Sequence, residues 1–293
     1  MGTLAFCGLG QMGAPMAARL LDTGDHVVVW NRTPERAKTL VERGARLAAS
    51  PAEAAAGAEG VFTMLSTPEA VAAVLFGPEG VVHGLAPGAT LIEMSTVGPD
   101  VVRSVAARLP DGVHLLDAPV LGSVPQATEG TLKVFVGGGD GSDGHVVERW
   151  LRVLERFGRP MHLGPLGSGA AMKLVANATL VSLMATLGEA LALADGLGLD
   201  QGAVLDVLAD SPIAVTARSK RSRVESGSYP PNFKLALAAK DARLVTEAAA
   251  AAGAPARLAG AARAWFEEAE AAGLGELDYS AVVAHLRGRP AAG

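Results

Sequence analysis

Short apolar runs alternate with amphipathic segments through the first half of the chain. The runs are rich in Val, Leu, Ile and Phe, and most end in Gly, Ser or Asn, a pattern typical of buried strands. The predicted strands are residues 3–7, 26–30, 60–65, 90–94, 113–117 and 134–136. Apolar residues at helical spacing predict helices between them, over residues 35–43, 68–75 and 99–109 and from Ser50 onward. This alternation predicts an α/β fold with a parallel, doubly wound sheet.

The second half carries helical patterns and no strand pattern. The predicted helices are residues 178–197, 201–208, 235–252, 255–272 and 280–286. The stretch Gly167–Asn177 leads into the first of them, and Ser168 is the expected N-cap residue. We place the boundary between the two halves near Gly164-Pro165.

A glycine-rich turn follows the first predicted strand directly. Gly8-Leu9-Gly10-Gln11-Met12-Gly13 stands between a strand and a helix, which is the context that a dinucleotide-binding G-x-G-x-x-G motif requires. The first glycine makes the turn, the second lets the backbone approach a pyrophosphate, and the third allows close helix packing. We therefore predict an N-terminal Rossmann-type cofactor domain over residues 1–164. An all-helical domain for substrate binding and oligomerisation follows over residues 165–293.

The end of the second predicted strand indicates which cofactor binds. An NAD-binding unit usually has an acid there to hold the ribose 2′-hydroxyl, but this chain has Asn31-Arg32-Thr33. Arg32 can pair with a 2′-phosphate, and Asn31 and Thr33 can donate hydrogen bonds to it. The sequence thus favours NADP(H), with NAD(H) as the other possibility. Leu65, Ser66 and Thr96 are further cofactor candidates, because they lie at the carboxyl ends of other predicted strands.

Lys173 and Asn177 are the candidate catalytic residues. They lie four residues apart, so a helix places them on one face. An ammonium and an amide there can bind one small polar molecule. We expect Lys173 to act as a general acid/base, with a pKa lowered by burial.

Composition excludes some classes of protein. The chain has 293 residues, 49% of them hydrophobic, and a net charge of −5, so a nucleic-acid partner is not expected. The small basic cluster at residues 218–223 is interpreted as a solvated face or loop. The six histidines show no ligand spacing, so no metal site is predicted.

Cysteine content and hydropathy bear on location. The single cysteine, Cys7, lies in an apolar run, where it is expected to be an inert core residue of a protein in a reducing, cytoplasmic compartment. The start of the chain lacks the basic region of a signal peptide. The apolar run 175–199 is long enough to cross a membrane, but Asn177, Glu189 and Asp195 interrupt it. We interpret it as a buried core helix and expect no membrane partner.

Four motifs, in order along nearly the whole chain, resemble those of the β-hydroxyacid dehydrogenase family. That family includes 3-hydroxyisobutyrate dehydrogenase and the tartronate semialdehyde and glyoxylate/succinic semialdehyde reductases. Residues 8–16 resemble its N-terminal signature, and residues 117–123 (Asp-Ala-Pro-Val-Leu-Gly-Ser) resemble its substrate motif. Residues 167–177 resemble its catalytic motif, and Lys240-Asp241 its late cofactor-binding motif. The resemblance implies hydride transfer between NADP(H) and a small hydroxy acid or aldehyde acid.

The resemblance also implies roles for individual residues. Lys173 would be the general acid/base and Asn177 would help to hold the substrate. Gly122 and Ser123 would contact the substrate carboxylate, partly through backbone N–H groups. The remaining implied contacts are Thr96 and Lys240 with the cofactor, and Phe233 and Asp241 with the closed substrate site.

Two departures from the family pattern affect the expected substrate. Leu121 stands where the family usually has Ser, which removes one hydroxyl contact, and Ser123 replaces a family glycine, as in the glyoxylate-reductase branch. Ser123 could supply the missing hydroxyl from a different position. A bulkier or less polar acid than 3-hydroxyisobutyrate is therefore possible.

Three other functions share parts of this pattern. An imine reductase often has the same Asn-Arg-Thr-Pro after its second strand, but usually Asp or Tyr where this chain has Lys173. A non-catalytic NADP-binding module would lack that lysine. Proteins that carry out phosphogluconate-type oxidation have a longer helical part than this chain.

The long apolar helix has more apolar surface than one small domain needs, so a homodimer or homotetramer is expected.

Overall fold

A computed structural model of the protein describes residues 2–139 and 144–293. The chain forms two compact units, residues 1–173 and 174–293. The predicted boundary at 164/165 precedes helix α8 (Ser168–Gly196), whereas the units divide inside that helix, after Lys173. Each unit is described by itself below.

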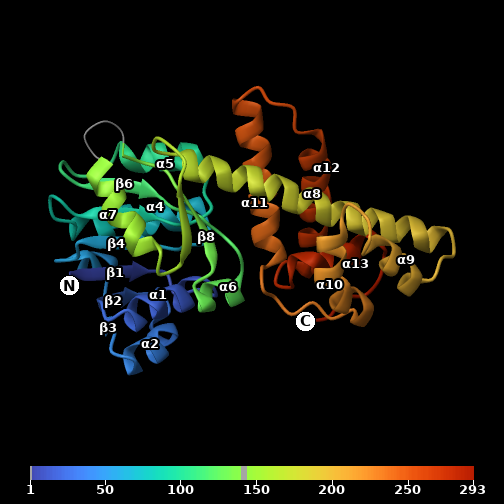
Figure 1. The fold of residues 1–293 in the computed structure, drawn as a ribbon, viewed down its shortest axis with the longest axis horizontal. Helices are drawn as coiled ribbons and strands as arrows, with labels where there is room; N and C mark the ends of the chain where they lie inside the picture. Colours follow the sequence, from blue (N-terminus) through green and yellow to red (C-terminus); the bar gives the residue numbers. More distant parts are fainter. Residues whose placement is uncertain (1, 140–143) are drawn as a thin grey trace. The chain divides into compact units, whose positions relative to one another are not determined.

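The first unit is built on a six-stranded parallel sheet (Figure 1), so the predicted doubly wound α/β fold is confirmed. The strand order is β3-β2-β1-β4-β5-β6. The strands are β1 (Thr3–Cys7), β2 (His26–Trp30), β3 (Arg46–Leu47), β4 (Gly60–Thr63), β5 (Thr90–Glu93) and β6 (His114–Asp117). The sequence did not predict β3, because it has only two residues and both are exposed.

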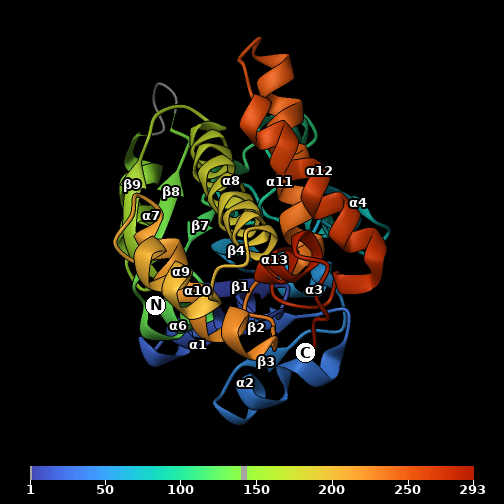
Figure 2. The same cartoon turned by 90° about the vertical axis from the view of Figure 1, so that its right-hand side faces the viewer.

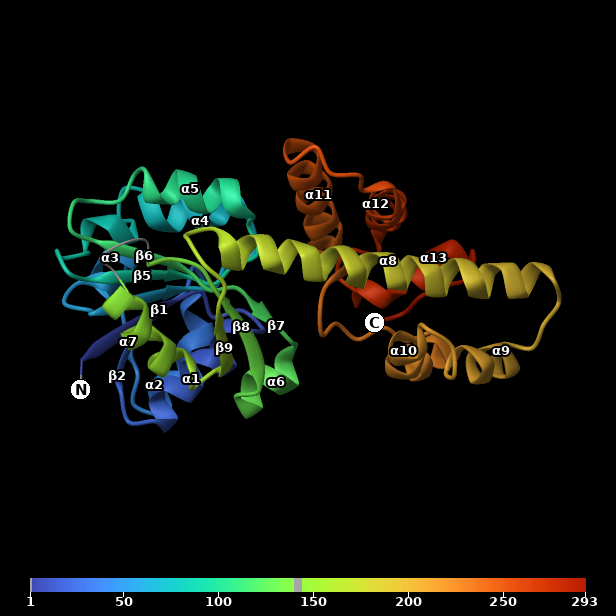
Figure 3. The ribbon, with the colours of Figure 1, turned by 45° about the horizontal axis from the view of Figure 1, so that its top comes forward.

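Helices cover both faces of this sheet (Figure 3). One face carries α1 (Gly13–Asp22), the 3₁₀ helix η1 (Pro34–Ala37), α2 (Lys38–Glu42), α6 (Val124–Glu129) and α7 (Gly144–Leu154). The other carries α3 (Pro51–Ala55), α4 (Pro68–Phe76), the 3₁₀ helix η2 (Val81–His83) and α5 (Pro99–Ala106). Successive strand residues point to opposite faces, so Phe6 packs with the first set and Cys7 with the second.

Two buried residues of the sheet illustrate this packing. The rings of Phe6 and Phe62 stack with centroids 5.9 Å apart, and Phe157 packs edge-on against Phe62 at 5.6 Å. Cys7 is fully buried on the opposite face, and burial raises the pKa of its thiol to about 12. A thiol with such a high pKa is inert at neutral pH, which agrees with the predicted core role of Cys7.

A second, three-stranded sheet was only partly predicted. It has the order β7-β8-β9, with β7 (Val120–Leu121) antiparallel and β9 (Gly158–His162) parallel to β8 (Leu132–Val136). The sequence indicated only residues 134–136 of β8. Strand β9 is an edge strand that is largely exposed and contains Pro160, so it lacks the apolar alternation by which strands are predicted.

The second unit is helical, as predicted. Its helices are the later part of α8, then α9 (Gln201–Leu208), α10 (Ala214–Ser226), α11 (Leu235–Ala251), α12 (Arg257–Ala269) and α13 (Val282–Leu286). A π-helical turn (Glu270–Leu274) follows α12, and a 3₁₀ turn, η5 (Tyr279–Ala281), precedes α13. Helices α11 and α12 lie side by side (Figure 2).

Helix α8 is long and apolar enough to cross a membrane, by length and composition alone. Its side chains Val181, Met184, Leu187 and Leu191 recur at helical spacing and are buried in the core of the helical unit. Other apolar side chains of the helix, such as Val175 (62%) and Leu193 (64%), are exposed. The helix is thus buried along one side and exposes apolar side chains on another, so only part of it is the core helix that was expected.

The basic cluster at residues 218–223 lies on helix α10 and is in part the solvated face that was expected. Arg218 is exposed, but Lys220 is only 8% exposed. The burial of Lys220 was not predicted, because this helix has few apolar residues to mark a buried face. The Lys220 ammonium is instead stabilised by an ion pair with Asp278, which is distant in sequence.

Candidate functional site

A cavity of about 480 Å³ lies at the carboxyl ends of β1, β2 and β4 in the first unit. Ligands of doubly wound sheets bind at these strand ends. The predicted cofactor residues that line the cavity are Gly8, Gly10, Asn31, Arg32, Thr33, Leu65 and Ser66. The structure therefore brings together the glycine-rich turn, the end of β2 and the end of β4 around one space.

The three glycines of the turn differ in what a side chain at each position would meet. Gly8 has φ +104°, and a Cβ there would lie 2.4 Å from the Met64 carbonyl oxygen. A Cβ on Gly13 would lie 1.9 Å from the Gly8 carbonyl oxygen, so Gly13 allows the first turn of α1 to pack against the loop. A Cβ on Gly10 would meet nothing within 4 Å. Gly10 thus has open space beside its backbone where it lines the cavity.

Asn31 lines the cavity and also makes two hydrogen bonds within the chain. Its Oδ1 accepts a hydrogen bond from the Leu9 N–H at 2.8 Å, and its Nδ2 donates to the Thr33 carbonyl at 2.9 Å. The side chain therefore connects the glycine-rich turn to the end of β2. Arg32 and Thr33 are exposed at the cavity.

Arg36 is a cavity residue that the sequence reasoning missed. It lies on η1, four residues after Arg32, so the cavity has two guanidinium groups at the end of β2. The repeat of arginine at a spacing of four was the available signal. Glu79 contributes the one carboxylate among the lining residues that the structure describes.

The other predicted cofactor residues are distributed differently. Leu9, Gln11, Met12 and Gly13 belong to the same turn but are not among the described residues that line the cavity, and neither is Thr96. Thr96 is half-buried after the end of β5.

Two buried carboxyl groups lie side by side at the ends of β5 and β6. Glu93 and Asp117 are paired residues of the parallel ladder. Glu93 accepts hydrogen bonds from Thr63 Oγ1 at 2.5 Å and from the Ser95 N–H at 2.7 Å. Burial raises the pKa of Glu93, and the neighbouring Asp117 adds to that rise, while these hydrogen bonds oppose it. Ser95 Oγ in turn accepts from the Leu65 N–H at 2.8 Å, so this group positions a cavity residue.

Asp117, rather than Ser168, caps helix α8. Ser168 was the predicted N-cap but is the first residue of the helix. Asp117 accepts hydrogen bonds from the Gly167 N–H at 2.7 Å and from the Ala170 N–H at 2.6 Å. Burial raises the pKa of Asp117, and the backbone donors oppose that rise. The first residue of the predicted substrate motif thus fixes the start of the helix that carries Lys173.

Gly122 and Ser123 lie between β7 and α6. Gly122 has φ +142°, and a Cβ there would lie 2.6 Å from Leu132 Cδ2, so the turn requires glycine. Ser123 precedes α6, and its N–H and Oγ both donate to Gln126 Oε1 at 2.9 Å. The N–H and hydroxyl of Ser123, which were predicted to contact a substrate carboxylate, are therefore bonded within the chain.

Three predicted residues meet in the helical unit. Asn177 on α8 donates from Nδ2 to Asp241 Oδ2 on α11 at 2.6 Å. Lys240 Nζ lies 2.8 Å from Asp241 Oδ1, at ion-pair distance but without the direction of a hydrogen bond. Each of the three is at most 8% exposed. Buried polar groups that pair with one another fix side-chain orientation, so Asp241 sets the direction of the Asn177 amide.

Lys173 and Phe233 complete the set of predicted site residues. Lys173 is half-buried and lies one helical turn before Asn177 on α8. Phe233 lies in the segment between α10 and α11, half-buried, with its ring 5.4 Å from that of Tyr279. Among residues 2–139 and 144–293, no three His, Cys, Asp or Glu side chains are grouped to hold a metal ion.

Two family models together match nearly the whole chain. The one described as the NAD binding domain of 6-phosphogluconate dehydrogenase matches residues 3–177. The one described as the NAD-binding domain of NADP-dependent 3-hydroxyisobutyrate dehydrogenase matches residues 167–286. The chain therefore has both nicotinamide-cofactor-binding domains of this group of proteins.

Similar proteins carry several names. The 3-sulfolactaldehyde reductase of Escherichia coli is 35% identical over 98% of this chain and 96% of its own length. The cytokine-like nuclear factor N-PAC of Bos taurus is 33% identical over 95% of this chain, which spans only 50% of that protein. The structure of Mycobacterium tuberculosis 3-hydroxyisobutyrate dehydrogenase with L-serine has 34% identity and a TM-score of 0.85, covering 98% of this chain and 99% of that one.

The motifs, the fold and these matches agree along the chain. The glycine-rich turn opens a parallel sheet with a cavity at its carboxyl edge, and Lys173 and Asn177 lie on the helix that leads into the helical unit. The family models cover both parts. The chain belongs to the β-hydroxyacid dehydrogenase family.

Proposed function

We propose that the protein transfers a hydride between NADP(H) and a small hydroxy acid or aldehyde acid. The observation that carries this proposal is the cavity at the ends of β1, β2 and β4, with open space beside Gly10 and two arginines at the end of β2. These features fit a dinucleotide: backbone N–H groups for the pyrophosphate, and guanidinium groups for a phosphate on the ribose.

The preference for NADP(H) rests on charge at the end of β2. Arg32 and Arg36 both line the cavity, and residues 31–33 include no acid to accept a hydrogen bond from the ribose 2′-hydroxyl. A 2′-phosphate is dianionic, so it gains more from two guanidinium groups than a hydroxyl does. NAD(H) would lack that interaction.

Lys173 is the proposed general acid/base. The bound nicotinamide supplies or accepts the hydride. In the reducing direction, the Lys173 ammonium stabilises the negative charge that grows on the carbonyl oxygen and donates a proton to it. In the oxidising direction, the neutral amine removes the proton of the substrate hydroxyl. Asn177, oriented by Asp241, offers a second hydrogen-bonding group one helical turn away.

The proposed substrate is a small carboxylic acid with an aldehyde or hydroxyl group. The name 3-hydroxyisobutyrate dehydrogenase gives the substrate of that relative as a hydroxy carboxylic acid. The name 3-sulfolactaldehyde reductase gives the substrate of the other as an aldehyde whose acid group is a sulfonate. Phe233 and Gly122 are proposed to line the substrate site. Leu121 ends β7 as an apolar residue, which favours an acid with an apolar substituent over one with an extra hydroxyl.

A panel of substrates tests this function. The purified protein would be assayed for oxidation of NADPH and NADH with glyoxylate, succinic semialdehyde, tartronate semialdehyde, methylmalonate semialdehyde and a cyclic imine. We expect turnover of at least one aldehyde acid, with a higher kcat/KM for NADPH than for NADH. Equal use of both cofactors would contradict the assignment of Arg32 and Arg36. Turnover of the imine alone would make the protein an imine reductase, and NADPH binding without any turnover would indicate a non-catalytic module.

A further inference from the structure

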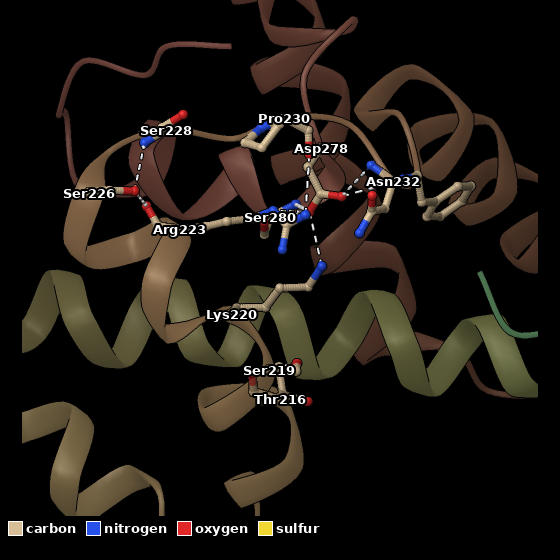
Figure 4. Close-up of polar contacts among 11 residues, drawn as sticks. Thr216, Ser219, Lys220, Arg223, Ser226, Ser228, Pro230, Asn232, Asp278 and Ser280 are labelled. Carbon is tan, nitrogen blue, oxygen red and sulfur yellow. Dashed lines mark hydrogen bonds and ion pairs between the residues drawn. The ribbon is translucent and has the colours of Figure 1, made fainter. Parts of the chain in front are cut away.

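One buried carboxylate in the helical unit connects α10 to the segment that opens α11 (Figure 4). Asp278 is completely buried. Its Oδ1 accepts hydrogen bonds from Lys220 Nζ at 2.9 Å, from Ser280 Oγ at 2.6 Å and from the Ser280 N–H at 3.2 Å. Its Oδ2 accepts from the N–H groups of Asn232 at 3.2 Å and Phe233 at 3.3 Å. The two oxygens therefore bind different elements.

Backbone hydrogen bonds join the same two segments. The Leu235 N–H donates to the Leu277 carbonyl at 2.8 Å, and the Tyr279 N–H donates to the Phe233 carbonyl at 2.7 Å. The ring of Phe233 also packs against the ring of Tyr279. The chain around Asp278 thus fixes both the backbone and the aromatic side chain that immediately precede α11.

Helix α11 then carries Asp241, fewer than two turns after its first residue, Leu235. A helix transmits a displacement of its first turn along its axis. The hydrogen bond between Asn177 and Asp241 is 2.6 Å long, and a hydrogen bond weakens steeply when distance and angle change. The position of the first turn of α11 therefore affects the geometry of this pair.

We propose that Asp278 is a positioning residue: it anchors the start of α11, and through that helix it holds Asp241 against Asn177 and fixes Phe233. It does not touch the reacting atoms. This inference rests on the proposed function, in which Asn177, Asp241 and Phe233 belong to the substrate site.

The cationic groups near Asp278 favour the ionised form of its carboxyl group. Burial by itself raises the pKa of Asp278, but hydrogen bonds from Ser280 and the Lys220 ammonium outweigh it and hold the pKa below its usual range. Arg223 Nε lies 3.8 Å from Asp278 Oδ1 and adds a second cation. An ionised carboxylate accepts hydrogen bonds at both oxygens, so it can bind Lys220 and the two backbone N–H groups at the same time.

The test replaces Asp278 by Asn in the full-length protein. An amide accepts at one oxygen only, so its NH₂ group must face either Lys220 and Ser280 or the N–H groups of residues 232 and 233. We expect Asp278→Asn to speed amide hydrogen exchange at residues 232–241 by about tenfold or more, through local opening. We also expect kcat/KM for the acid substrate to fall by about tenfold or more.

Matched variants separate positioning from general stability. Ser280→Ala removes one donor from Oδ1 and leaves the hydrogen bonds of Oδ2, so its kcat/KM is expected to stay within about threefold of the wild type. Asp195→Asn weakens another charged group of the helical unit, the pair of Asp195 with Arg287, without touching α11. It is expected to lower the melting temperature but to leave KM and exchange at 232–241 unchanged.

A second pair of variants applies if Asp278→Asn does not fold. Lys220→Met should change kcat/KM and exchange at 232–241 in the same direction as Asp278→Asn, with a smaller effect because Arg223 remains near Asp278. Lys220→Arg keeps a cation and should restore both quantities towards the wild type. No change in either quantity for Lys220→Met would overturn the inference.

The outcomes distinguish the two proposals. An inactive wild type on the panel contradicts the proposed function, and exchange at 232–241 then decides whether Asp278 is an anchor. With an active wild type, a folded Asp278→Asn protein with kcat/KM within about twofold and unchanged exchange overturns the inference. Faster exchange together with lower kcat/KM, absent in Ser280→Ala and Asp195→Asn, supports it.

Discussion

Lys173 is the residue on which the proposed chemistry depends most. Replacing it with Met keeps much of the side-chain length but removes the ammonium. We expect Lys173→Met to lower kcat by about a hundredfold or more, the usual contribution of a general acid/base, while NADPH binding is kept. Steady-state kinetics and fluorescence titration with NADPH measure the two quantities.

An exposed lysine provides the control for that substitution. Lys133 on β8 is exposed, so Lys133→Met is expected to leave kcat unchanged. An active Lys173→Met protein would contradict the proposed mechanism. Loss of NADPH binding in Lys173→Met would point instead to a structural effect.

Glu93 gives a pH-dependent prediction. Because its pKa is raised in the folded protein, the folded state holds a proton that the unfolded state releases. Its contribution to stability is therefore present at low pH and is lost as the pH rises from about 4, the unfolded value. Glu93→Gln does not titrate, so its free energy of unfolding should increase relative to that of the wild type as the pH rises.

Denaturant unfolding between pH 4 and 8 measures this effect. Glu93→Ala is the comparison, because it leaves the donors of Thr63 and Ser95 without their acceptor. We expect it to lose about 2–4 kcal/mol. A wild type that gains stability over Glu93→Gln as the pH rises would show that the carboxylate is the favoured form.

At the scale of elements, two glycines of the glycine-rich turn are expected to affect different properties: Gly13 the stability of the fold, and Gly10 the binding of the cofactor. Gly13→Ala would place a Cβ 1.9 Å from the Gly8 carbonyl oxygen, whereas Gly10→Ala would place one in open space. We expect Gly13→Ala to lower the free energy of unfolding by about 2 kcal/mol or more, through overpacking. Gly10→Ala should stay as stable as the wild type but bind NADPH at least about tenfold more weakly.

Thermal melting and NADPH titration of both variants test that separation. A Gly10→Ala protein with normal affinity for NADPH would mean that the cofactor does not approach the turn there. A Gly13→Ala protein of normal stability would mean that the turn can move away from α1.

The elements that could be predicted from sequence are those with a periodic apolar pattern. Strands β1 and β2 have the predicted bounds, because each is a short apolar run between turn residues. Strand β9, with Pro160, and helix α10, with few apolar residues, lack such a pattern. Their positions depend on partners distant in sequence, namely β8 and Asp278.

The candidate site shows the same division. Gly8, Gly10 and Arg32 follow from motif and position alone, and they line one cavity. The hydrogen bond of Asn31 to Leu9 and the capping of α8 by Asp117 could not be read from spacing, because each joins segments far apart in the chain. The sequence thus indicated which segments line the cavity. The structure adds that the polar side chains of Asn31 and Asp117 make hydrogen bonds that join these segments to others within the chain.

At the scale of the whole molecule, we propose that the protein is a homodimer or homotetramer. Helix α8 exposes Val175 and Leu193 at more than 60%, and extensive exposed apolar surface usually marks an interface. Analytical ultracentrifugation should give two or four times the chain mass of 29.7 kDa. Leu193→Glu should shift the equilibrium towards the single chain, whereas a wild type of one chain mass would contradict the proposal.

The central claim is hydride transfer to an aldehyde acid, and isotope transfer tests it most directly. NADPH carrying deuterium at both C4 positions of the nicotinamide would be incubated with the protein and the best substrate of the panel. Mass spectrometry of the hydroxy acid should then show one deuterium per molecule, on the carbon that bears the hydroxyl. A product without deuterium, or NADPH that stays unoxidised with every substrate, would contradict the account.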